Sequence, residues 1–424
     1  MSLTALAKEI LKHAQTLDAY IEENGLPEPS FDSSGPLDFP IVASTKTAKL
    51  LESRTALMEL NKELSDLAAG PTHAVATAAL IPQFECMALR AVNGFRIPEA
   101  VPITGSATFS EIAASTGVSE EIVTRIIRHA TTMRIFSESD GNVSHNAASR
   151  ALLENSLLRD YVTTALNTGF RVASNFQEAV AKYGTVDEPT QTAFNVAFGT
   201  DESFYQFIQR DEEKERMKAL SGFMGFMVQQ GDTGGRTHSP EHLLDAFDWA
   251  GIGNALVVDV GGSLGEVSAL IAAQHNNLRF IVQDLAPIIA LAEPHSQIAF
   301  EVHNFLTPQP PTSADADVFL LRHIMHDHSD KHAATILRNI TLVMKPTAKI
   351  LIVDFIPSAD APNVVRKAKG TGDMFMMALL AGKERERTDW ERLLQNADTR
   401  LRIMKFTETA GSAFGVVEVG FANE

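Results

Sequence analysis

The stretch Val257-Val-Asp-Val-Gly-Gly-Ser-Leu-Gly265 decides the fold, because it places a short run of apolar, β-branched residues directly before a glycine-rich turn. The segment that follows, residues 266–274, has the character of a helix. Gly261, Gly262 and Gly265 allow the backbone to turn tightly and to approach a ligand without a Cβ atom in the way. This order of strand, turn and helix predicts a nucleotide-binding site in an α/β domain.

A second short apolar run, Phe280-Ile-Val-Gln, comes next along the chain and ends in Asp284. An acidic residue at the end of that strand is placed to bind the two hydroxyl groups of a ribose. Two ligands share these features, NAD and S-adenosylmethionine. The turn reads Gly-Gly-Ser-Leu-Gly rather than Gly-x-Gly-x-x-Gly, which suits a pyrophosphate less well and favours S-adenosylmethionine. A third interpretation stays open, in which the glycines serve only a tight turn.

Outward from this site, short apolar runs alternate with helical segments through the C-terminal half of the chain. The runs span residues 256–260, 279–282, 318–321, 349–355 and 401–406. Such alternation is typical of a parallel, doubly wound sheet of the Rossmann-like α/β class. Ligands of these sheets bind at the carboxyl ends of the strands, which is where the glycine-rich turn falls.

The chain has 424 residues, which is long for one hydrophobic core, so we expect two domains. Its N-terminal part contains helical stretches at residues 3–20, 48–67 and 72–92, the first two separated by a linker rich in proline. The third stretch is rich in alanine and nearly free of charge. A helix that is apolar on most faces must be buried in its own chain or against another subunit, so a homodimer is expected.

Residues 108–153 contain the pattern of a winged helix. Residues 108–129 read as a helix, a glycine-containing turn and a second helix, and residues 134–145 predict a two-stranded wing. Such a module either binds DNA or serves as a structural and dimerisation scaffold. The second helix begins with Glu120 and Glu121, and negative charge at the start of a recognition helix opposes DNA binding. The scaffold is therefore the favoured interpretation.

Composition narrows the classes of partner and compartment. A formal net charge of −17 argues against a large phosphate-binding surface and favours an uncharged or amphipathic small molecule over nucleic acid. Cys86 is the sole cysteine, so an intrachain disulfide and a thiolate zinc cluster are both excluded. Charged residues interrupt the N-terminus, and we expect no apolar run near the ~20 residues of a membrane-spanning helix. A cytoplasmic protein is the expectation.

Seven segments taken together resemble a known family. They are Phe247-Asp-Trp249, Val257–Ser268, Val282-Gln-Asp284, Phe305–Pro310, Leu321–Asp327, Ile352-Val-Asp354 and Gly382-Lys-Glu-Arg385. In order and rough spacing the chain resembles the plant and fungal small-molecule O-methyltransferases, typified by the enzymes that methylate caffeate and flavonoids. The resemblance covers nearly the whole chain. It implies a mostly helical winged-helix dimerisation domain over residues 1–165 and a Rossmann-like S-adenosylmethionine-binding methyltransferase domain over residues 166–424.

The resemblance also implies a phenolic or enolic acceptor, a polyketide-type secondary metabolite, and a histidine that removes its proton. That position is His326, followed by Asp327. A phenol has a pKa of ~10, so an imidazole within hydrogen-bond reach is needed to expose the oxyanion at neutral pH. By position, Asp354 and Glu386 are the two carboxylates that flank the base, with Glu384 as a rival to Glu386. Alternative interpretations of the histidine are a surface residue of a His-rich stretch and, more remotely, part of a metal site.

Binding residues follow by position in the same way. Those expected at the cofactor are Gly261, Asp284, Asn304, Phe305 and Arg322, and those expected at the acceptor are His129, Asp327, Met374 and Met377. For Arg322 a surface charge at a strand end is an alternative, and for His129 a packed or capping histidine of its helix. No metal is expected.

Two departures from the family pattern leave room for other chemistry. Asn304 stands where an acidic residue contacts adenine, and His328 stands where tryptophan usually follows the His-Asp pair. Some fungal members that resemble this family catalyse dehydration and pericyclic ring closure while keeping the cofactor, whose sulfonium would then act electrostatically. Retention of His326 favours methyl transfer over this alternative. A non-catalytic winged-helix regulator is a third possibility.

Overall fold

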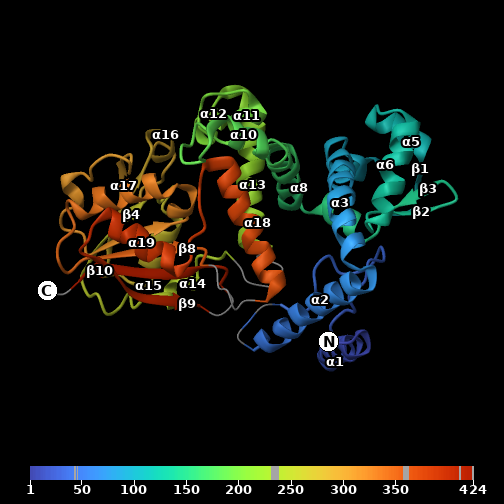
Figure 1. The fold of residues 1–424 in the computed structure, drawn as a ribbon, viewed down its shortest axis with the longest axis horizontal. Helices are drawn as coiled ribbons and strands as arrows, with labels where there is room; N and C mark the ends of the chain where they lie inside the picture. The colour runs from blue at the N-terminus through green and yellow to red at the C-terminus, as the bar shows by residue number, and fades with distance from the viewer. Residues whose placement is uncertain (43, 45, 231–237, 357–361, 410–411, 423–424) are drawn as a thin grey trace. The chain divides into compact units, whose positions relative to one another are not determined.

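The computed structural model describes residues 1–42, 44, 46–230, 238–356, 362–409 and 412–422 (Figure 1). The chain divides into two compact units. Unit 1 comprises residues 1–174, 205–235 and 362–364, and unit 2 comprises residues 175–204, 236–361 and 365–424. Unit 1 first ends at residue 174, nine residues after the boundary predicted at 165/166 (174 against 165). Residues 205–235 and 362–364 also belong to unit 1.

A seven-stranded sheet forms the centre of unit 2 (Figure 1). Its strands are β4 (Leu256–Val260), β5 (Arg279–Asp284), β6 (Ile298–Val302), β7 (Val318–Arg322), β8 (Lys349–Asp354), β9 (Leu401–Glu408) and β10 (Gly415–Phe421). The spatial order is β6-β5-β4-β7-β8-β10-β9. Neighbours from β6 to β8 are parallel, and β10 runs antiparallel to both β8 and β9. All five predicted strands are present, while β6 and β10 were not predicted.

The remaining described elements of unit 2 are helices and single turns. They are α10 (Phe176–Tyr183), α11 (Ala193–Phe198), α14 (His242–Ala246), α15 (Glu266–Gln274), α16 (Ala286–Ile289), η3 (Pro311–Ser313), η4 (Met325–Asp327), α17 (Asp330–Thr341), α18 (Asn363–Leu380, from its third residue on) and α19 (Arg387–Ala397). The doubly wound arrangement that the alternating pattern predicts is confirmed.

Helices cover both faces of this sheet, because alternate side chains of each strand point to opposite faces. On one face Val257 of β4 packs in a core with Trp249, beside α14, and Ile271 of α15. On the other face Val258 packs in a core with residues of α17 and with Trp390 of α19. Strands buried on both faces read as continuous apolar runs, which is why the sequence revealed them.

The strand order reverses direction at β4, whose neighbours are β5 on one side and β7 on the other. Chain connections leave β4 and β7 toward opposite sides at this point, so their carboxyl ends open a crevice. The glycine-rich turn, Asp284 and the His326 turn all follow the carboxyl ends of these strands. The fold therefore gathers most of the predicted site at one edge of the sheet.

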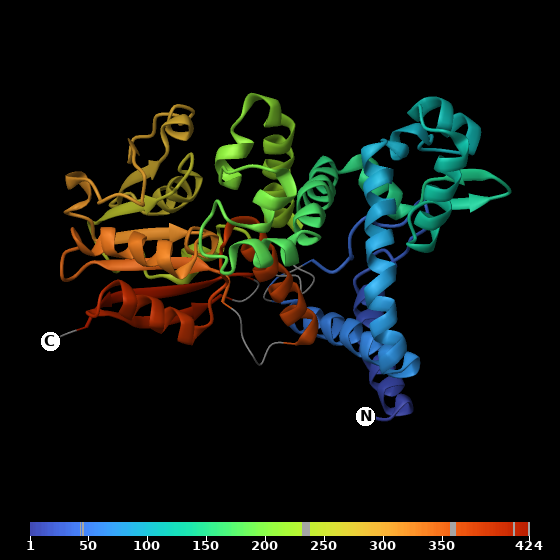
Figure 2. The same ribbon diagram turned by 45° about the horizontal axis from the view of Figure 1, so that its top comes forward.

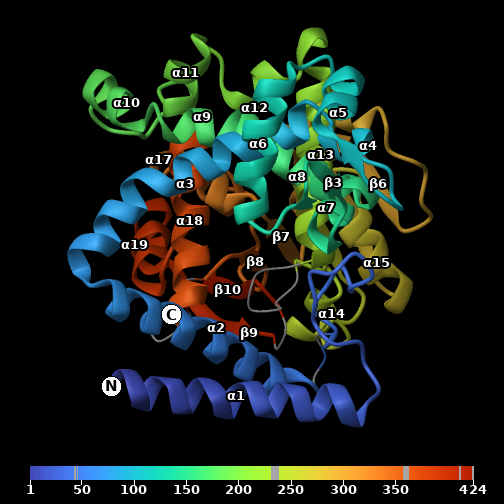
Figure 3. The same cartoon turned by 90° about the vertical axis from the view of Figure 1, so that its right-hand side faces the viewer.

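Unit 1 is mostly helical. It contains α1 (Leu3–Glu23), α2 (Ala48–Ala69), α3 (Pro71–Gly94), α4 (Ile97–Ala100), α5 (Phe109–Thr116), α6 (Glu120–Thr132), α7 (Ala147–Glu154), α8 (Ser156–Thr164), η1 (Ala165–Gly169), α9 (Phe170–Ala173), most of α12 (Phe204–Ile208), η2 (Asp211–Glu213) and α13 (Lys214–Gln230). Helices α1 and α2 lie side by side (Figure 3). The Met- and Phe-rich stretch of α13 packs on α8, where the rings of Tyr161 and Phe223 stack with centroids 4.8 Å apart.

The predicted winged helix is present in unit 1. Helices α5 and α6 accompany a three-stranded sheet of β1 (Ala107–Thr108), β3 (Asn142–Ser144) and β2 (Ser137–Ser139), whose hairpin is seen in teal in Figure 2. Thr108 and Glu111 form a capping box at the start of α5, and Gly117 ends this helix in the left-handed conformation. Local capping thus fixes both ends of the first helix of the motif.

Helix α3 corrects one expectation. Among the described residues, α3 has the length and mean hydropathy of a membrane-spanning helix. We expected no apolar run of that length. Only 11% of its most apolar window is buried in this chain, and Val75 is 72% exposed. The alternative of burial within its own chain is therefore wrong for most of this helix, and its apolar surface needs another cover.

Candidate active site

The glycine-rich turn after β4 requires glycine for two separate reasons. Gly261 and Gly265 have positive φ angles of 72° and 78°, a conformation that side chains disfavour. A Cβ atom on Gly261 would lie 2.5 Å from Cδ1 of Ile324, and one on Gly262 would lie 2.5 Å from the carboxyl carbon of Asp259. Glycine is therefore required here both by the bend of the backbone and by the side chains packed against the turn, and these constraints hold for a tight turn with or without a ligand.

Asp284 lies at the end of β5 directly beside this turn. Its Oδ2 accepts a hydrogen bond of 2.9 Å from the Ser263 amide, and its Oδ1 accepts one of 2.7 Å from the Leu285 amide. These bonds fix the carboxylate while leaving lone pairs for other donors. The contact of Asp284 with a ribose stays a prediction.

A buried aspartate and a half-buried arginine lie close to the turn. Asp259 is 2% exposed and accepts a 2.7 Å hydrogen bond from Ser268, and burial raises its pKa to about 6. Arg322, at the end of β7, donates a 2.9 Å hydrogen bond to the carbonyl oxygen of His238. Burial lowers the pKa of Arg322, and Asp259 and Asp354 oppose this effect. The alternative of a surface charge at a strand end is therefore wrong for Arg322.

The segment expected at the adenine forms a compact turn after β6. The Asn304 Oδ1 accepts a 3.0 Å hydrogen bond from the Leu306 amide, so this side chain shapes the turn. Phe305 packs on the core, and its ring meets the ring of His328 edge-on with centroids 5.4 Å apart. Burial lowers the pKa of His328 to about 4, so this ring is neutral at physiological pH. His328 thus serves as an aromatic neighbour of Phe305, as a tryptophan would.

His326 lies on the single turn η4 after β7. Its Nδ1 is 2.8 Å from Oε1 of Glu384, and its Nε2 is 3.4 Å from Oδ1 of Asp327. Burial alone would lower the pKa of His326, but the carboxylates of Asp327, Glu384 and Asp354 raise it to about 10. The ring is therefore no ordinary surface histidine. Among the described residues no group of three or more His, Cys, Asp and Glu side chains is placed to hold a metal ion.

The prediction that Glu386 flanks the histidine is wrong, and its rival Glu384 takes that place. Lys383 donates its amide to the carbonyl oxygen of His326 at 2.8 Å, which pins the next residue, Glu384, against the ring. Glu386 instead is the N-cap of α19, where it forms a capping box with Asp389. The residues that follow Glu384 lead into the N-cap of α19 and do not displace Glu384 from the ring of His326.

Asp354, the other predicted flanking carboxylate, ends β8 and is fully buried. Neither of its carboxylate oxygens has a hydrogen-bond partner among the described residues. Burial raises its pKa to about 7, and the positive charge of His326 opposes this effect. Asp354 therefore acts on His326 through its charge and not through a hydrogen bond.

Three residues that sequence reasoning did not assign support this cluster. Arg385 is fully buried, and its guanidinium bonds to the backbone around His326. Asp373 of α18 accepts a 2.8 Å hydrogen bond from the Glu384 amide. Gly382 has no room for a side chain, because a Cβ would lie 2.3 Å from the His326 carbonyl oxygen.

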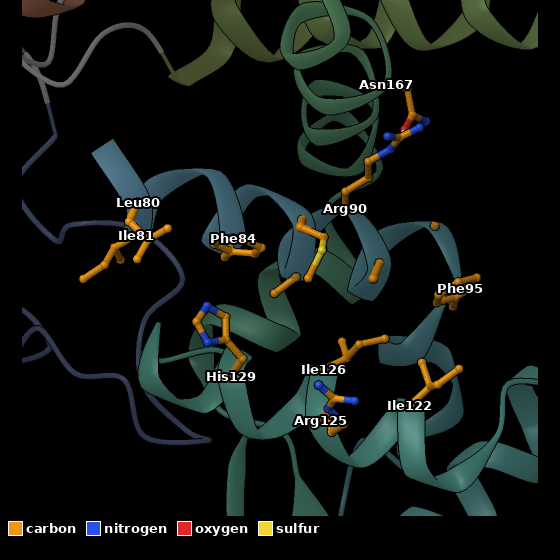
Figure 4. Close-up of a pocket in the computed structure, with 14 residues that line it drawn as sticks. Leu80, Ile81, Phe84, Arg90, Phe95, Ile122, Arg125, Ile126, His129 and Asn167 are labelled. Carbon is orange, nitrogen blue, oxygen red and sulfur yellow. The ribbon is translucent and has the colours of Figure 1, made fainter. Parts of the chain in front are cut away.

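The remaining predicted acceptor residues lie on two elements. Met374 and Met377 are on α18, where Met374 is 51% exposed and Met377 is half-buried. His129 lies on α6 in unit 1, and its Nε2 is buried without a hydrogen-bond partner among the described residues. It lines a groove between α3 and α6 with a volume of about 990 Å³ (Figure 4). The roles of these residues toward an acceptor stay predictions.

The fold and the site together define a class. A seven-stranded sheet with an antiparallel β10, a glycine-rich turn after its central strand and an acidic residue at the end of the next strand is the architecture of a nucleotide-binding α/β domain. The sequence profile of the O-methyltransferase domain matches residues 177–399, and that of the O-methyltransferase dimerisation domain matches residues 83–155. The chain belongs to the O-methyltransferase family. The predicted enzyme class and its cofactor, S-adenosylmethionine, are confirmed at this level.

A curated relative agrees with this assignment, and two solved structures share the fold. The O-methyltransferase VdtC of Byssochlamys spectabilis is 33% identical over 98% of this chain and 97% of its own length. OxaC in complex with SAH and oxaline has the same fold, with a TM-score of 0.72 and 24% identity over 99% of both chains. A structure described as a pericyclic reaction enzyme has a TM-score of 0.67 and 23% identity over 89% of this chain and 98% of that one.

The packed glycine turn generates a prediction. Gly261→Ala adds a methyl group that meets Ile324 in a left-handed backbone, so we expect affinity for S-adenosylmethionine to fall about tenfold or more in calorimetry. Gly253→Ala is the matched control, because Gly253 has a φ of 66° but open space around it. It should lose about 1 kcal/mol of stability and keep its affinity. Equal affinities for the two variants would contradict this view of the turn.

Proposed function

We propose that the protein is an S-adenosylmethionine-dependent O-methyltransferase that acts on a phenolic or enolic secondary metabolite of polyketide type, with His326 as general base. The observation that carries the proposal is the 2.8 Å contact between His326 Nδ1 and Glu384 Oε1, at the sheet edge that holds the glycine-rich turn. A carboxylate on one ring nitrogen orients the imidazole and increases the basicity of the other nitrogen. Fungal relatives named O-methyltransferases support the reaction type.

The pKa of the proposed base is close to that of a phenol. The pKa of His326, which the neighbouring carboxylates raise to about 10, lies close to the pKa of ~10 of a phenol. Once the ring has released the proton that it holds at neutral pH, transfer of the phenol proton to it costs little free energy. Bound S-adenosylmethionine would supply the methyl group to the resulting phenolate, and S-adenosylhomocysteine would be the leaving group. Proton, methyl group and leaving group are then accounted for without any other nucleophile in the chain.

The charge of the site suits a cationic donor. The carboxylates of Asp327, Asp354 and Glu384 surround the single ring of His326. Asp354, with its raised pKa of about 7, carries only part of its charge at neutral pH, and the guanidinium of Arg385 adds a positive charge nearby. The carboxylates around the ring stabilise the imidazolium that forms during proton transfer and favour a cationic donor, while Arg385 opposes part of this effect.

The base assignment is tested with His326→Ala. We expect methyl transfer from labelled S-adenosylmethionine to a panel of phenols to fall about 100- to 10,000-fold, because the variant has no imidazole to take the proton of the phenol. Affinity for S-adenosylmethionine, measured by calorimetry, should stay within about twofold. His295→Ala, at an exposed histidine of the same unit, serves as the control and should keep full turnover. Unchanged turnover in His326→Ala would remove the proposed base.

The orienting role of Glu384 is tested by pH. Glu384→Gln removes a negative charge from Nδ1, so the imidazolium loses stabilisation and the pKa of His326 must fall from about 10. We expect nuclear magnetic resonance titration of the ring to show a drop of one unit or more. Glu386→Gln, two residues along in the cap of α19, should leave the ring titration unchanged. The reverse pattern would restore Glu386 as the flanking carboxylate.

We propose further that the protein is a homodimer in which a second copy covers the exposed side of α3. Ile81, Phe84 and Met87 of this helix are 46%, 46% and 56% exposed, and they line the groove of Figure 4. A contiguous apolar surface of this kind marks a protein interface. The dimerisation-domain profile, which matches residues 83–155, includes Phe84 and Met87 on one wall of this groove and the residues of α6 on the other.

The proposed interface predicts the effect of one buried charge. Phe84→Glu should convert a dimer into a monomer in sedimentation velocity, because a carboxylate without a partner is costly in an apolar interface. Leu342→Glu is the matched control, since Leu342 is 72% exposed at the end of α17 in unit 2, and it should sediment as the wild type does. A monomeric wild-type protein at micromolar concentration would disprove the interface.

Pericyclic or dehydrating ring closure is a second candidate, favoured by one observation. The raised pKa of His326 keeps its ring protonated at neutral pH, and an imidazolium can donate a hydrogen bond to a carbonyl as charge develops on it. The fold similarity to a pericyclic reaction enzyme supports the same possibility. Ring closure of an unstable polyketide precursor without transfer of the labelled methyl group would favour this candidate over the first.

A further inference from the structure

Arg385 is the largest charged side chain that unit 2 buries completely, with 0% of it exposed. Its guanidinium makes hydrogen bonds in three directions. Nη1 donates to the Met325 carbonyl at 2.7 Å, Nη2 donates to the His328 carbonyl at 2.7 Å, and Nε donates to Oδ1 of Asp330 at 2.9 Å. Burial of a guanidinium is costly unless its donors are satisfied, and here they are.

The two carbonyl groups bracket the histidine. Met325 begins the single turn η4, His326 and Asp327 complete it, and His328 is the first residue after it. The turn is weak by itself, because its internal bonds measure 3.2 Å from the Asp327 amide and 3.3 Å from the His328 amide. The shorter bonds from Arg385 at both ends hold the turn where its own bonds do not.

Lys383 and Glu384, the two residues before Arg385, also contact the turn. The Lys383 amide donates to the His326 carbonyl oxygen at 2.8 Å, and Glu384 contacts the ring of that residue. Three consecutive residues therefore contact the backbone before, at and after His326 as well as its side chain. A shift of Arg385 must change the angle at which the imidazole faces its ligand.

We propose that Arg385 is a positioning residue of the reaction, which sets the orientation of His326 by clamping the backbone on both sides of it. The proposal rests on the proposed function of His326 and assigns to Arg385 no contact with donor or acceptor. Small errors in the placement of a base slow a reaction sharply, because the reacting atoms must start in contact at the correct angle. The clamp therefore predicts an effect on turnover larger than its effect on binding.

Arginine is required at this position for a geometric reason. A planar guanidinium presents donors in fixed and divergent directions, so one side chain can reach two carbonyls and a carboxylate. Trp390 lies under it, with the guanidinium carbon 5.4 Å from the ring centroid. A lysine keeps the charge opposite Asp330 but cannot reach both carbonyls at once.

The test uses Arg385→Lys in the full-length protein. We expect kcat for methyl transfer to fall about 10- to 100-fold, while the dissociation constant for S-adenosylmethionine stays within about twofold. Arg387→Lys is the matched control, since Arg387 is 67% exposed and pairs with Glu391 at 3.2 Å, and it should keep the wild-type rate. A donor affinity that falls in parallel with kcat would show general damage to the fold and overturn the proposal.

A double-mutant comparison separates positioning from other effects. In a His326→Ala background there is no ring to orient, so Arg385→Lys should change the residual rate by less than about twofold. The same 10- to 100-fold loss in that background would overturn the proposal.

A second readout does not require methyl transfer. The ring nitrogens of ¹⁵N-labelled His326 should change their chemical shifts in Arg385→Lys and keep them in Arg387→Lys. Absence of methyl transfer with changed shifts would reject the proposed function and retain the clamp. Unchanged shifts in Arg385→Lys would reject the clamp whatever the reaction.

Discussion

The contact between Nδ1 of His326 and Glu384 is the interaction on which the proposed chemistry of this molecule depends. It decides which ring nitrogen is engaged by the protein and which one is left for a ligand. The longer approach of Asp327 to Nε2, at 3.4 Å, leaves that nitrogen able to exchange its neighbour for an acceptor hydroxyl. Everything else in this region of unit 2 maintains that geometry, from the sheet edge that ends in η4 to the segment that carries Glu384.

The fold maintains the contact between His326 and Glu384 by burying charged side chains. A fold selected for stability alone would leave such side chains exposed. Asp354 has no exposed surface and no hydrogen-bond partner among the described residues, and Arg385 is buried beside it in the same unit. The free energy of burying these groups is offset only because opposite charges lie close together. Such a concentration of perturbed groups at the carboxyl edge of a parallel sheet is characteristic of a reactive centre rather than of a structural core.

The sequence predicted the parts of the fold that repeat a simple physical rule. Strands buried on both faces, such as β4 and β7, appear as continuous apolar runs, and Gly261 appears where a backbone must bend against Ile324. The edge strand β6 was missed because exposed and buried residues mix along it, and β10 was missed although its valines resemble those of β4. Glu386 was preferred to Glu384 because sequence spacing does not reveal that the Lys383 amide bonds to the His326 carbonyl. Arg385 was missed for a similar reason, since burial of an arginine follows from tertiary contacts alone.

Helix α3 has a consequence for how the chain matures. Its apolar side is complete as soon as the helix forms, yet in this chain most of its apolar window is uncovered, and the buried residues are Ala88 and Val92 near its C-terminal end. A newly made polypeptide therefore exposes an apolar surface from an early stage of synthesis. Its solubility depends on binding the second copy proposed to cover this surface before it binds unrelated proteins. Apparent resistance to heat should then rise with protein concentration, as mass action requires when folding and assembly are coupled.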